Sequence, residues 1–209
     1  MLLEDFFIDS DELVLAALSQ AKVAIAGAGG LGSNCAVALA RSGTGKLIIC
    51  DFDRVSAANL NRQYYFREQI GLYKVEALKH TLKRINPFSD YDIHNVKLDK
   101  DNLVELFEDV DIIIEAFDEA SMKQMLIEMW SEFMGEIPLI VASGIGGFGK
   151  NEEIRQRQSG NLFLIGDEIS DVHKGYKPLA PRVGVVANMQ ANLAVELLVK
   201  KFYGKGRKV

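Results

Sequence analysis

Residues 22–33 read KVAIAGAGGLGS, and this stretch decides the fold. Lys22–Ala26 has the short, continuously apolar pattern of a buried parallel strand. The glycines that follow at positions 27, 29 and 32 fit the pattern G-x-G-x-x-G, and Ser33–Arg41 then reads as a helix. A tight strand-to-helix turn needs residues without a Cβ atom, and its backbone amides can approach a phosphate closely. The stretch therefore predicts a strand, a phosphate-binding turn and a helix.

The rest of the chain alternates in the same way. A short helix is predicted before the first strand, over residues 11–20. Further strand patterns and helical patterns then take turns along the chain, the strands at 46–50, 91–96, 110–115 and 138–142 and the helices at 71–85, 101–107 and 119–134. Strands that alternate with helices predict an α/β fold with a Rossmann-like, doubly wound and mostly parallel sheet.

The regular alternation of strand and helix patterns ends after Ser143. A glycine-rich turn at 144–149 is followed by extended, antiparallel-looking segments over 154–165 and by a long closing helix over 183–203. We expect a single domain over residues 1–209. It would consist of an N-terminal helical segment (1–20), a Rossmann-like core (21–143) and a C-terminal extension (144–209) with a small antiparallel part and the closing helix.

Composition excludes several functional classes. The chain has 209 residues, of which 48% are hydrophobic and 25% charged, so it can bury a core without disulfides or structural metals. Its net charge of −5 supplies no global basic field for nucleic acid or an anionic membrane. The two cysteines, Cys35 and Cys50, form no C-x-x-C pair, so we predict core thiols and no zinc. Without a signal peptide or a long apolar run, a cytoplasmic location is expected.

The glycine turn alone does not define a function. Asp51 ends the next predicted strand, where a carboxylate can accept both ribose hydroxyl protons, and these features by themselves suggest NAD. A helix N-terminus stabilises an anion by roughly 0.3–2 kcal/mol. Micromolar binding requires about 8 kcal/mol. A polyphosphate therefore needs cationic side chains from elsewhere in the chain.

A second group of polar residues supplies such side chains. Residues 51–63 read DFDRVSAANLNRQ, and GLYK at 71–74 opens a helix. The order G-x-G-G-x-G, D-x-D, N-x-x-R-Q and G-x-x-K resembles the ThiF/MoeB/HesA family of the ubiquitin-activating-enzyme superfamily. The resemblance resumes at Asp118 and in LAPRVGVVANMQA at 179–191, so it covers nearly the whole chain. The small size and the wording DFD…NLNRQ resemble most the short ThiF-like sulfur-carrier adenylyltransferases, which are linked to thiamin biosynthesis.

This resemblance implies a nucleotidyltransferase. Such an enzyme uses ATP and Mg²⁺ to adenylate the C-terminal glycine carboxylate of a small ubiquitin-like sulfur-carrier protein, ThiS-like and ending in Gly-Gly, and it releases pyrophosphate. It would act as a homodimer, without nucleic acid or membrane as a partner. Both reactants are anions, so the site must neutralise charge as it develops.

The resemblance also assigns roles to residues. Arg62, Lys74 and Asp118 are the expected catalytic residues: Arg62 offers a planar fork of donors to phosphate oxygens, Lys74 a compact charge, and Asp118 the one protein ligand of Mg²⁺. Taken singly, each is more often a surface charge or a helix cap, and only their ordered conjunction favours a site. The full ATP-binding set implied is Gly27, Gly29, Gly30, Gly32, Asp51, Asp53, Asn59, Arg62, Gln63, Lys74 and Asp118; for Asp53 the site role and a capping role are equally favoured.

The sequence departs from the family pattern at three points. No Arg or Lys precedes Lys22, although relatives often supply an N-terminal arginine to the neighbouring subunit. Glu119 stands after Asp118, where Asn is usual. No cysteine follows Cys50, so any sulfur is expected to come from a separate protein.

Two alternatives stay open, the second of them motivated by the missing N-terminal arginine and by Glu119. One is an NAD-dependent oxidoreductase, which uses only the glycine loop and Asp51. The other is a non-catalytic nucleotide-binding member of the same fold. The glycines at 144–149 fit a plain turn better than a surface that approaches a carrier tail.

Overall fold

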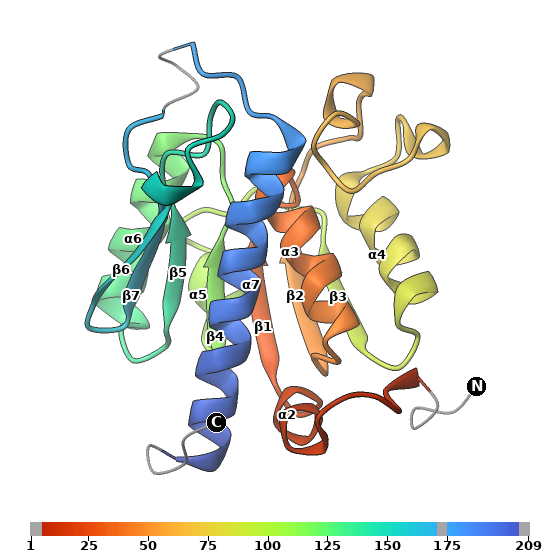
Figure 1. The fold of residues 1–209 in the computed structure, drawn as a ribbon, viewed down its shortest axis with the longest axis vertical. Coiled ribbons are helices and arrows are strands. Elements are labelled where there is room, and N and C mark those ends of the chain that lie inside the picture. The colour runs from red at the N-terminus through yellow and green to blue at the C-terminus, as the bar shows by residue number, and fades with distance from the viewer. Residues whose placement is uncertain (1–5, 171–174, 205–209) are drawn as a thin grey trace.

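A single seven-stranded sheet organises the chain, and the computed structural model describes it over residues 6–170 and 175–204. The strand order is β3-β2-β1-β4-β5-β7-β6 (Figure 1). Every neighbouring pair is parallel except β6 with β7. The strands are β1 (Lys22–Ala26), β2 (Lys46–Cys50), β3 (Asp90–His94), β4 (Ile112–Glu115), β5 (Leu139–Ala142), β6 (Arg155–Ser159) and β7 (Leu162–Gly166). The predicted Rossmann-like, mostly parallel α/β fold is confirmed.

Helices cover both faces of this sheet. The α-helices are α2 (Glu12–Leu18), α3 (Gly30–Arg41), α4 (Lys74–Ile85), α5 (Leu103–Phe107), α6 (Ala120–Phe133) and α7 (Ala180–Tyr203). Three short 3-10 helices complete the set, η1 (Ala57–Asn59), η2 (Arg67–Gln69) and η3 (Asn151–Glu153). One apolar cluster joins α2, α3, α4 and α7 to one face, and a second joins α5 and α6 to the other (Figure 1).

The alternation of side chains along each strand explains the two clusters. Val23 and Ile25 of β1 belong to the cluster under α3 and α7, whereas Ala24 and Ala26 belong to the one under α5 and α6. All four side chains are 0% exposed. Because both faces are covered, the strands read as continuous apolar runs, which is why the sequence located β1 and β2 at the observed residues.

The structure corrects three helix starts and the place of the C-terminal hairpin. The closing helix, α7, begins at Ala180 rather than residue 183. Helix α3 begins at Gly30 rather than Ser33, with Gly29 as its N-cap, so the glycine turn itself supplies the first helical turn. Helix α4 begins at Lys74 rather than residue 71, because Gly71 has a φ of +91° that no right-handed helix allows. The antiparallel hairpin predicted over 154–165 forms as β6 and β7, yet β7 also pairs in parallel with β5, so the extension continues the main sheet.

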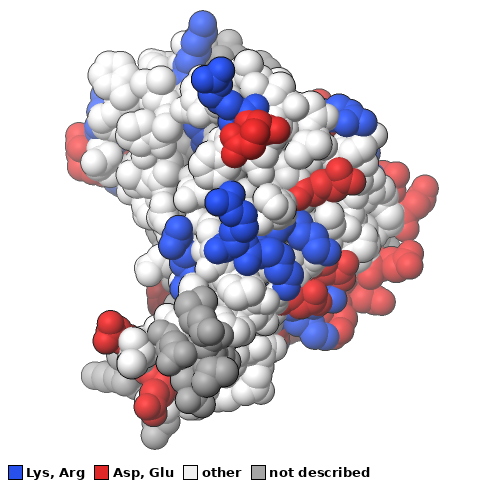
Figure 2. All heavy atoms as spheres, turned by 90° about the vertical axis from the view of Figure 1, so that its right-hand side faces the viewer, with Lys and Arg blue, Asp and Glu red and all other residues white. Residues whose placement is uncertain are grey.

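The surface carries its charges in patches. Figure 2 shows the side of the molecule on which α4 lies: Lys and Arg side chains gather near the middle of this face, and acidic side chains gather along one edge. The net charge of −5 is therefore unevenly distributed. Within residues 6–170 and 175–204, the helices are all too short or too polar to cross a membrane.

Two glycines make the strand-to-helix turn possible. Gly27 has a φ of +106°, and a Cβ atom on it would lie 2.8 Å from the carbonyl oxygen of Ala116, at the end of β4. A Cβ atom on Gly32 would lie only 1.9 Å from the carbonyl oxygen of Gly27. The first turn of α3 therefore presses against the end of β1 at a distance that only glycine permits.

This packing predicts opposite effects for two helical glycines. Gly32→Ala should lower the free energy of unfolding by about 1–3 kcal/mol, because the methyl group overlaps a backbone oxygen. Gly184→Ala in α7 should raise it by roughly 0.5–1 kcal/mol, since its added Cβ meets nothing within 4 Å and Ala favours a helix. Urea denaturation measures both, and equal effects would contradict this account of the turn.

Candidate nucleotide-binding site

The Gly27–Gly32 turn lies where the carboxyl ends of β1, β2 and β4 meet. The amide of Gly27 donates to the carbonyl of Cys50 at 2.8 Å, and Ala116 packs against Gly27 from the other side. Above Gly29 there is room, since the nearest atom to a Cβ built there is Nε2 of Gln63 at 3.9 Å. The turn thus presents the N-terminus of a twelve-residue helix to an open position, an arrangement that favours an anion.

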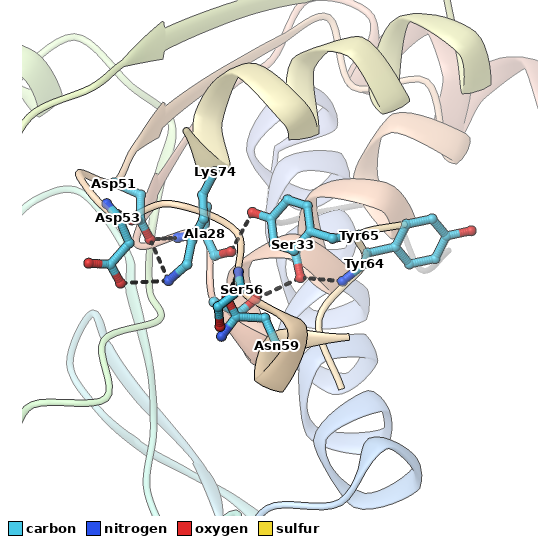
Figure 3. Close-up of polar contacts among 10 residues, drawn as sticks. Ala28, Ser33, Asp51, Asp53, Ser56, Asn59, Tyr64, Tyr65 and Lys74 are labelled. Atoms are coloured by element: carbon cyan, nitrogen blue, oxygen red, sulfur yellow. Dashed lines mark hydrogen bonds and ion pairs between the residues drawn. The ribbon is translucent and has the colours of Figure 1, made fainter. Parts of the chain in front are cut away.

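A buried lysine stands beside this turn. Lys74 begins α4 and is 6% exposed. Its Nζ lies 2.7 Å from Oδ2 of Asp53 and 3.8 Å from Oδ2 of Asp51 (Figure 3). Its own amide donates to the carbonyl of Asp53 at 2.9 Å, which fixes the start of the helix against the end of β2. A buried cation needs such partners, because removing its charge from water is costly.

Asp51 links that lysine to the glycine turn. Its Oδ2 accepts a hydrogen bond from the amide of Ala28 at 2.7 Å, and its Oδ1 accepts one from the amide of Asp53 at 2.8 Å. Burial raises the pKa of Asp51, and the Lys74 charge and the two amides act against that rise. Both carboxylate oxygens are thus engaged within the protein. The side chain of Asp53 is 50% exposed and is the more accessible of the two carboxylates.

Arg62 approaches the turn from the segment after β2. Its Cγ lies 3.7 Å from a Cβ built on Gly30, so its aliphatic stem covers the first residue of α3. Its Nη1 donates to the carbonyl of Ala58 at 3.1 Å and to Oδ1 of Asn61 at 2.9 Å. Among residues 6–170 and 175–204 the guanidinium has no carboxylate partner. The stem of Arg62 therefore lies at the turn, while its guanidinium contacts Ala58 and Asn61 of its own segment.

Asn59 and Gln63 come from the same segment and behave differently. Oδ1 of Asn59 accepts from the amide of Ser56 at 2.8 Å, so it stabilises the start of η1 (Figure 3). Gln63 is 9% exposed, and its Oε1 has no hydrogen-bond partner in the part of the chain that the structure describes. Leaving a buried acceptor unpaired costs about 1–3 kcal/mol. The atom of Gln63 nearest Gly29 is Nε2, a donor, which suits an acceptor of a ligand bound over the turn.

A set of hydrogen bonds that the sequence did not reveal holds this segment against the turn. The hydroxyl of Tyr65 donates to the carbonyl of Ala28 at 2.7 Å, and burial raises the pKa of this phenol. Ser33 donates to the carbonyl of Gly29 at 2.6 Å and accepts from the amide of Tyr64 at 2.9 Å (Figure 3). In the sequence, the polar Ser33 directly after the glycines was the one feature that could have predicted these bonds. No sequence feature indicated the role of Tyr65.

Asp118 lies three residues after the end of β4, just beyond the segment that contacts the glycine turn. The Ala116–Phe117 segment just before it contacts Gly27, with Cδ1 of Phe117 3.6 Å from a Cβ built there. Asp118 itself is exposed, and its carboxylate makes no hydrogen bond or ion pair with the described residues. The same residues include no cluster of three or more potential metal-ligating side chains. A single free carboxylate fits Mg²⁺ that is shared with phosphate oxygens, because this ion keeps few protein ligands.

A buried carboxylate that the sequence reasoning missed shapes the Asp118 turn. Glu115 is 0% exposed, and its Oε1 accepts from the amide of Phe117 at 2.8 Å. Its Oε2 accepts from Nζ of Lys123 and from the amide of Ala142 at 3.3 Å. Lys123 also donates to the carbonyl of Ala142 at 2.5 Å. The only sequence signal was one acidic residue at the end of the apolar run 110–115.

The structure therefore links Lys74 and Arg62 to the glycine turn and places Asp118 directly after the segment that contacts it. Lys74 pairs with Asp51, which binds the amide of Ala28 in the turn. The stem of Arg62 lies against Gly30, and Ala116 and Phe117, just before Asp118, contact Gly27. Two cations, one free carboxylate and a helix N-terminus at the carboxyl edge of a parallel sheet can bind a polyphosphate.

Comparison with known proteins supports this description. The family model described as "ThiF family" matches residues 5–208. The molybdopterin-synthase adenylyltransferase of Salmonella typhimurium is 31% identical over 189 residues, 87% of this chain and 74% of that one. Ubiquitin-like modifier-activating enzyme 5 of Xenopus laevis is 47% identical over 76 residues, 36% of this chain and 19% of that one.

Solved structures share the fold. The crystal structure of the Escherichia coli tRNA N6-threonylcarbamoyladenosine dehydratase TcdA has a TM-score of 0.86 at 21% identity and covers 96% of both chains. The match of the family model over residues 5–208 and the 31% identity to the Salmonella typhimurium enzyme agree with the arrangement at the glycine turn. The chain therefore belongs to the ThiF family.

Proposed function

We propose that this chain is an ATP-dependent adenylyltransferase that activates the C-terminal glycine carboxylate of a ubiquitin-like sulfur-carrier protein. The observation that supports the proposal is the contact of Lys74 with Asp51 and of the Arg62 stem with Gly30 at the Gly27–Gly32 turn, with the exposed Asp118 directly after the segment that contacts Gly27. The matched relatives support the reaction class, since they are named as adenylyltransferases and as a ubiquitin-like modifier-activating enzyme.

ATP fits this arrangement better than a dinucleotide. TcdA has been crystallised with ATP and with AMP, and MccB of Escherichia coli with ATP. In this chain the triphosphate would lie over the turn, with the amides of α3 and the Arg62 guanidinium on its oxygens. Lys74 would exchange its contact with Asp53 for one with phosphate, and Asp53 and Gln63 would face the ribose. Mg²⁺, when bound through Asp118, neutralises phosphate charge.

The chemistry needs this charge balance. A carboxylate oxygen of the carrier attacks the α-phosphorus of ATP, the bond from that phosphorus to the bridging oxygen breaks, and pyrophosphate leaves. Negative charge grows on the phosphoryl oxygens and on the leaving group. Arg62 and Lys74, once they contact the phosphates, would stabilise this charge as it develops.

The substrate is the finer part of the proposal. A carrier of the ThiS type, ending in Gly-Gly and serving thiamin thiazole synthesis, agrees with the short chain and with the wording of residues 51–63. A homodimer is proposed on the same resemblance. The NAD-dependent alternative is less favoured, because Asp51 uses both oxygens within the protein and Lys74 and Arg62 would have no role.

The first test measures carrier-dependent transfer of AMP. With Mg-ATP and the carrier encoded nearest its gene, the chain should produce a carrier with the added mass of AMP. Arg62→Ala should lower the rate by about 10³-fold or more, as arginines do in phosphoryl transfer generally. Asp118→Ala should lower it similarly while far-UV circular dichroism is unchanged.

Arg67→Ala provides the matched control, because Arg67 is an exposed arginine on the same segment. Its rate should stay within twofold of the wild type. ATP that binds without being cleaved when a carrier is present would favour the non-catalytic alternative instead. Equal losses in Arg67→Ala and Arg62→Ala would show that neither arginine has a special place at the phosphates.

The second test concerns the cysteines. Cys35 and Cys50 are 0% and 1% exposed; burial raises the pKa of both thiols, that of Cys50 to about 12. Native protein should therefore resist iodoacetamide at pH 8, and both thiols should react once guanidinium chloride unfolds the chain. Mass spectrometry counts the adducts. A labelled native protein, or a carrier linked to it through a thioester, would contradict adenylation without covalent transfer to this chain.

A further inference from the structure

An ion pair with nearly buried side chains lies outside the residues assigned above. Arg182, in the first turn of α7, is 4% exposed, and its Nη2 contacts Oδ2 of Asp167 at 2.5 Å. Its Nη1 donates to the carbonyl of Gly149 at 2.5 Å. Asp167 in turn accepts with Oδ1 from the amides of Ile169 and Ser170, both at 2.8 Å. The pair thus joins three segments: the glycine-rich turn 144–149, the turn after β7, and the start of α7.

The position of this arginine conflicts with local preference. The N-terminus of a helix carries a partial positive charge, and a cation in its first turn is unfavourable. Burying a guanidinium adds a desolvation cost, and its Nε has no partner in the part of the chain that the structure describes. A local choice that opposes stability points to a role in function.

The pair holds the turn 144–149 in one conformation. A Cβ atom on Gly144 would lie 2.0 Å from Oδ1 of Asp167, and one on Gly146 would lie 2.5 Å from the carbonyl oxygen of Tyr176. The amide of Gly147 donates to the carbonyl of Lys177 at 3.0 Å. This turn is therefore packed on two sides, which goes beyond the plain turn that the sequence favoured.

The same turn offers free donors beside the nucleotide site. Within the described ranges, the amides of Ile145 and Phe148 donate to no acceptor, and the Phe148 side chain is 80% exposed. The start of α7 connects the turn to the phosphate loop, because Cγ1 of Val183 lies 3.1 Å from a Cβ built on Gly30. Unpaired amides on a fixed turn suit an extended peptide, and close packing suits one that ends in glycines.

We propose that the Arg182–Asp167 pair is a positioning device that fixes the turn 144–149 as the receiving surface for the C-terminal residues of the carrier. This inference rests on the proposed function and adds two residues to it. Arg182 and Asp167 touch neither ATP nor the reacting carboxylate; they set the distance between the carrier tail and the phosphate loop.

The test removes both charges at once. In Arg182→Met/Asp167→Asn, no charge is left buried and unpaired, and the new amide oxygen can still accept from the two backbone amides, so the fold should persist. For the carrier protein that the wild type adenylates, we expect the double variant to have a KM at least tenfold higher than the wild type. Its Kd for a fluorescent ATP analogue should stay within twofold of the wild-type value. Amide hydrogen exchange at 144–149 should become faster.

Arg157→Met is the matched control. It removes the same side chain from an exposed pair with Glu168, whose Nε–Oε1 distance is 2.7 Å, and it should leave all three quantities unchanged. A folded double variant with unchanged carrier KM, or unchanged exchange at 144–149, would overturn the inference. Loss of the fold in the double variant would also overturn it, since the pair would then serve stability alone. A wild-type chain that adenylates no carrier would instead reject the proposed function itself, and the exchange measurement would still judge the pair.

Discussion

One buried cation organises the functional edge of this protein. Lys74 is buried at the start of α4, and among the residues that the structure describes its charge is balanced by Asp51 and Asp53. Asp51 also holds the amide of Ala28, so the lysine, the end of β2 and the glycine turn form one electrostatic unit. An uncompensated buried charge would cost several kcal/mol, which keeps this unit closed until another anion replaces one of the carboxylates. A phosphate group bound at the turn would be such an anion, close enough to replace Asp53 as the partner of Lys74.

The need to balance the buried Lys74 charge also explains the different roles of the surrounding residues. Asp51 is committed to the backbone, so the half-exposed Asp53 is the carboxylate that can release Lys74. Within the described parts of the chain, Arg62 adds a positive charge that has no carboxylate partner, and Asp118 adds a carboxylate that has no cationic partner. Glu115 is satisfied internally and holds the turn that carries Asp118. The site is thus prearranged, and its free charges complement those of a polyphosphate and a divalent cation.

The sequence predicted what depends on local pattern and missed what depends on distant partners. Strands β1 and β2 were located to the residue, because burial on both faces leaves an unbroken apolar run. The start of α3 was placed three residues late, since glycine usually weakens a helix, and here the helix begins inside the glycine turn. The engagement of Asp51 with Ala28 and the pair Arg182–Asp167 were invisible, because the partners lie 23 and 15 residues apart in the chain. The expected roles of Arg62, Lys74 and Asp118 came from their order along the chain, and their common location at one turn agrees with that order.

A crystal structure with Mg²⁺ and an ATP analogue that cannot be cleaved at the α-phosphorus is the most direct measurement. The account predicts the triphosphate over residues 27–32, Nζ of Lys74 moved from Asp53 to a phosphate oxygen, the Arg62 guanidinium on the phosphates and Asp118 on the metal ion. A nucleotide bound elsewhere, or one bound at the turn while Lys74 keeps its contact with Asp53 and Arg62 points away, would contradict it.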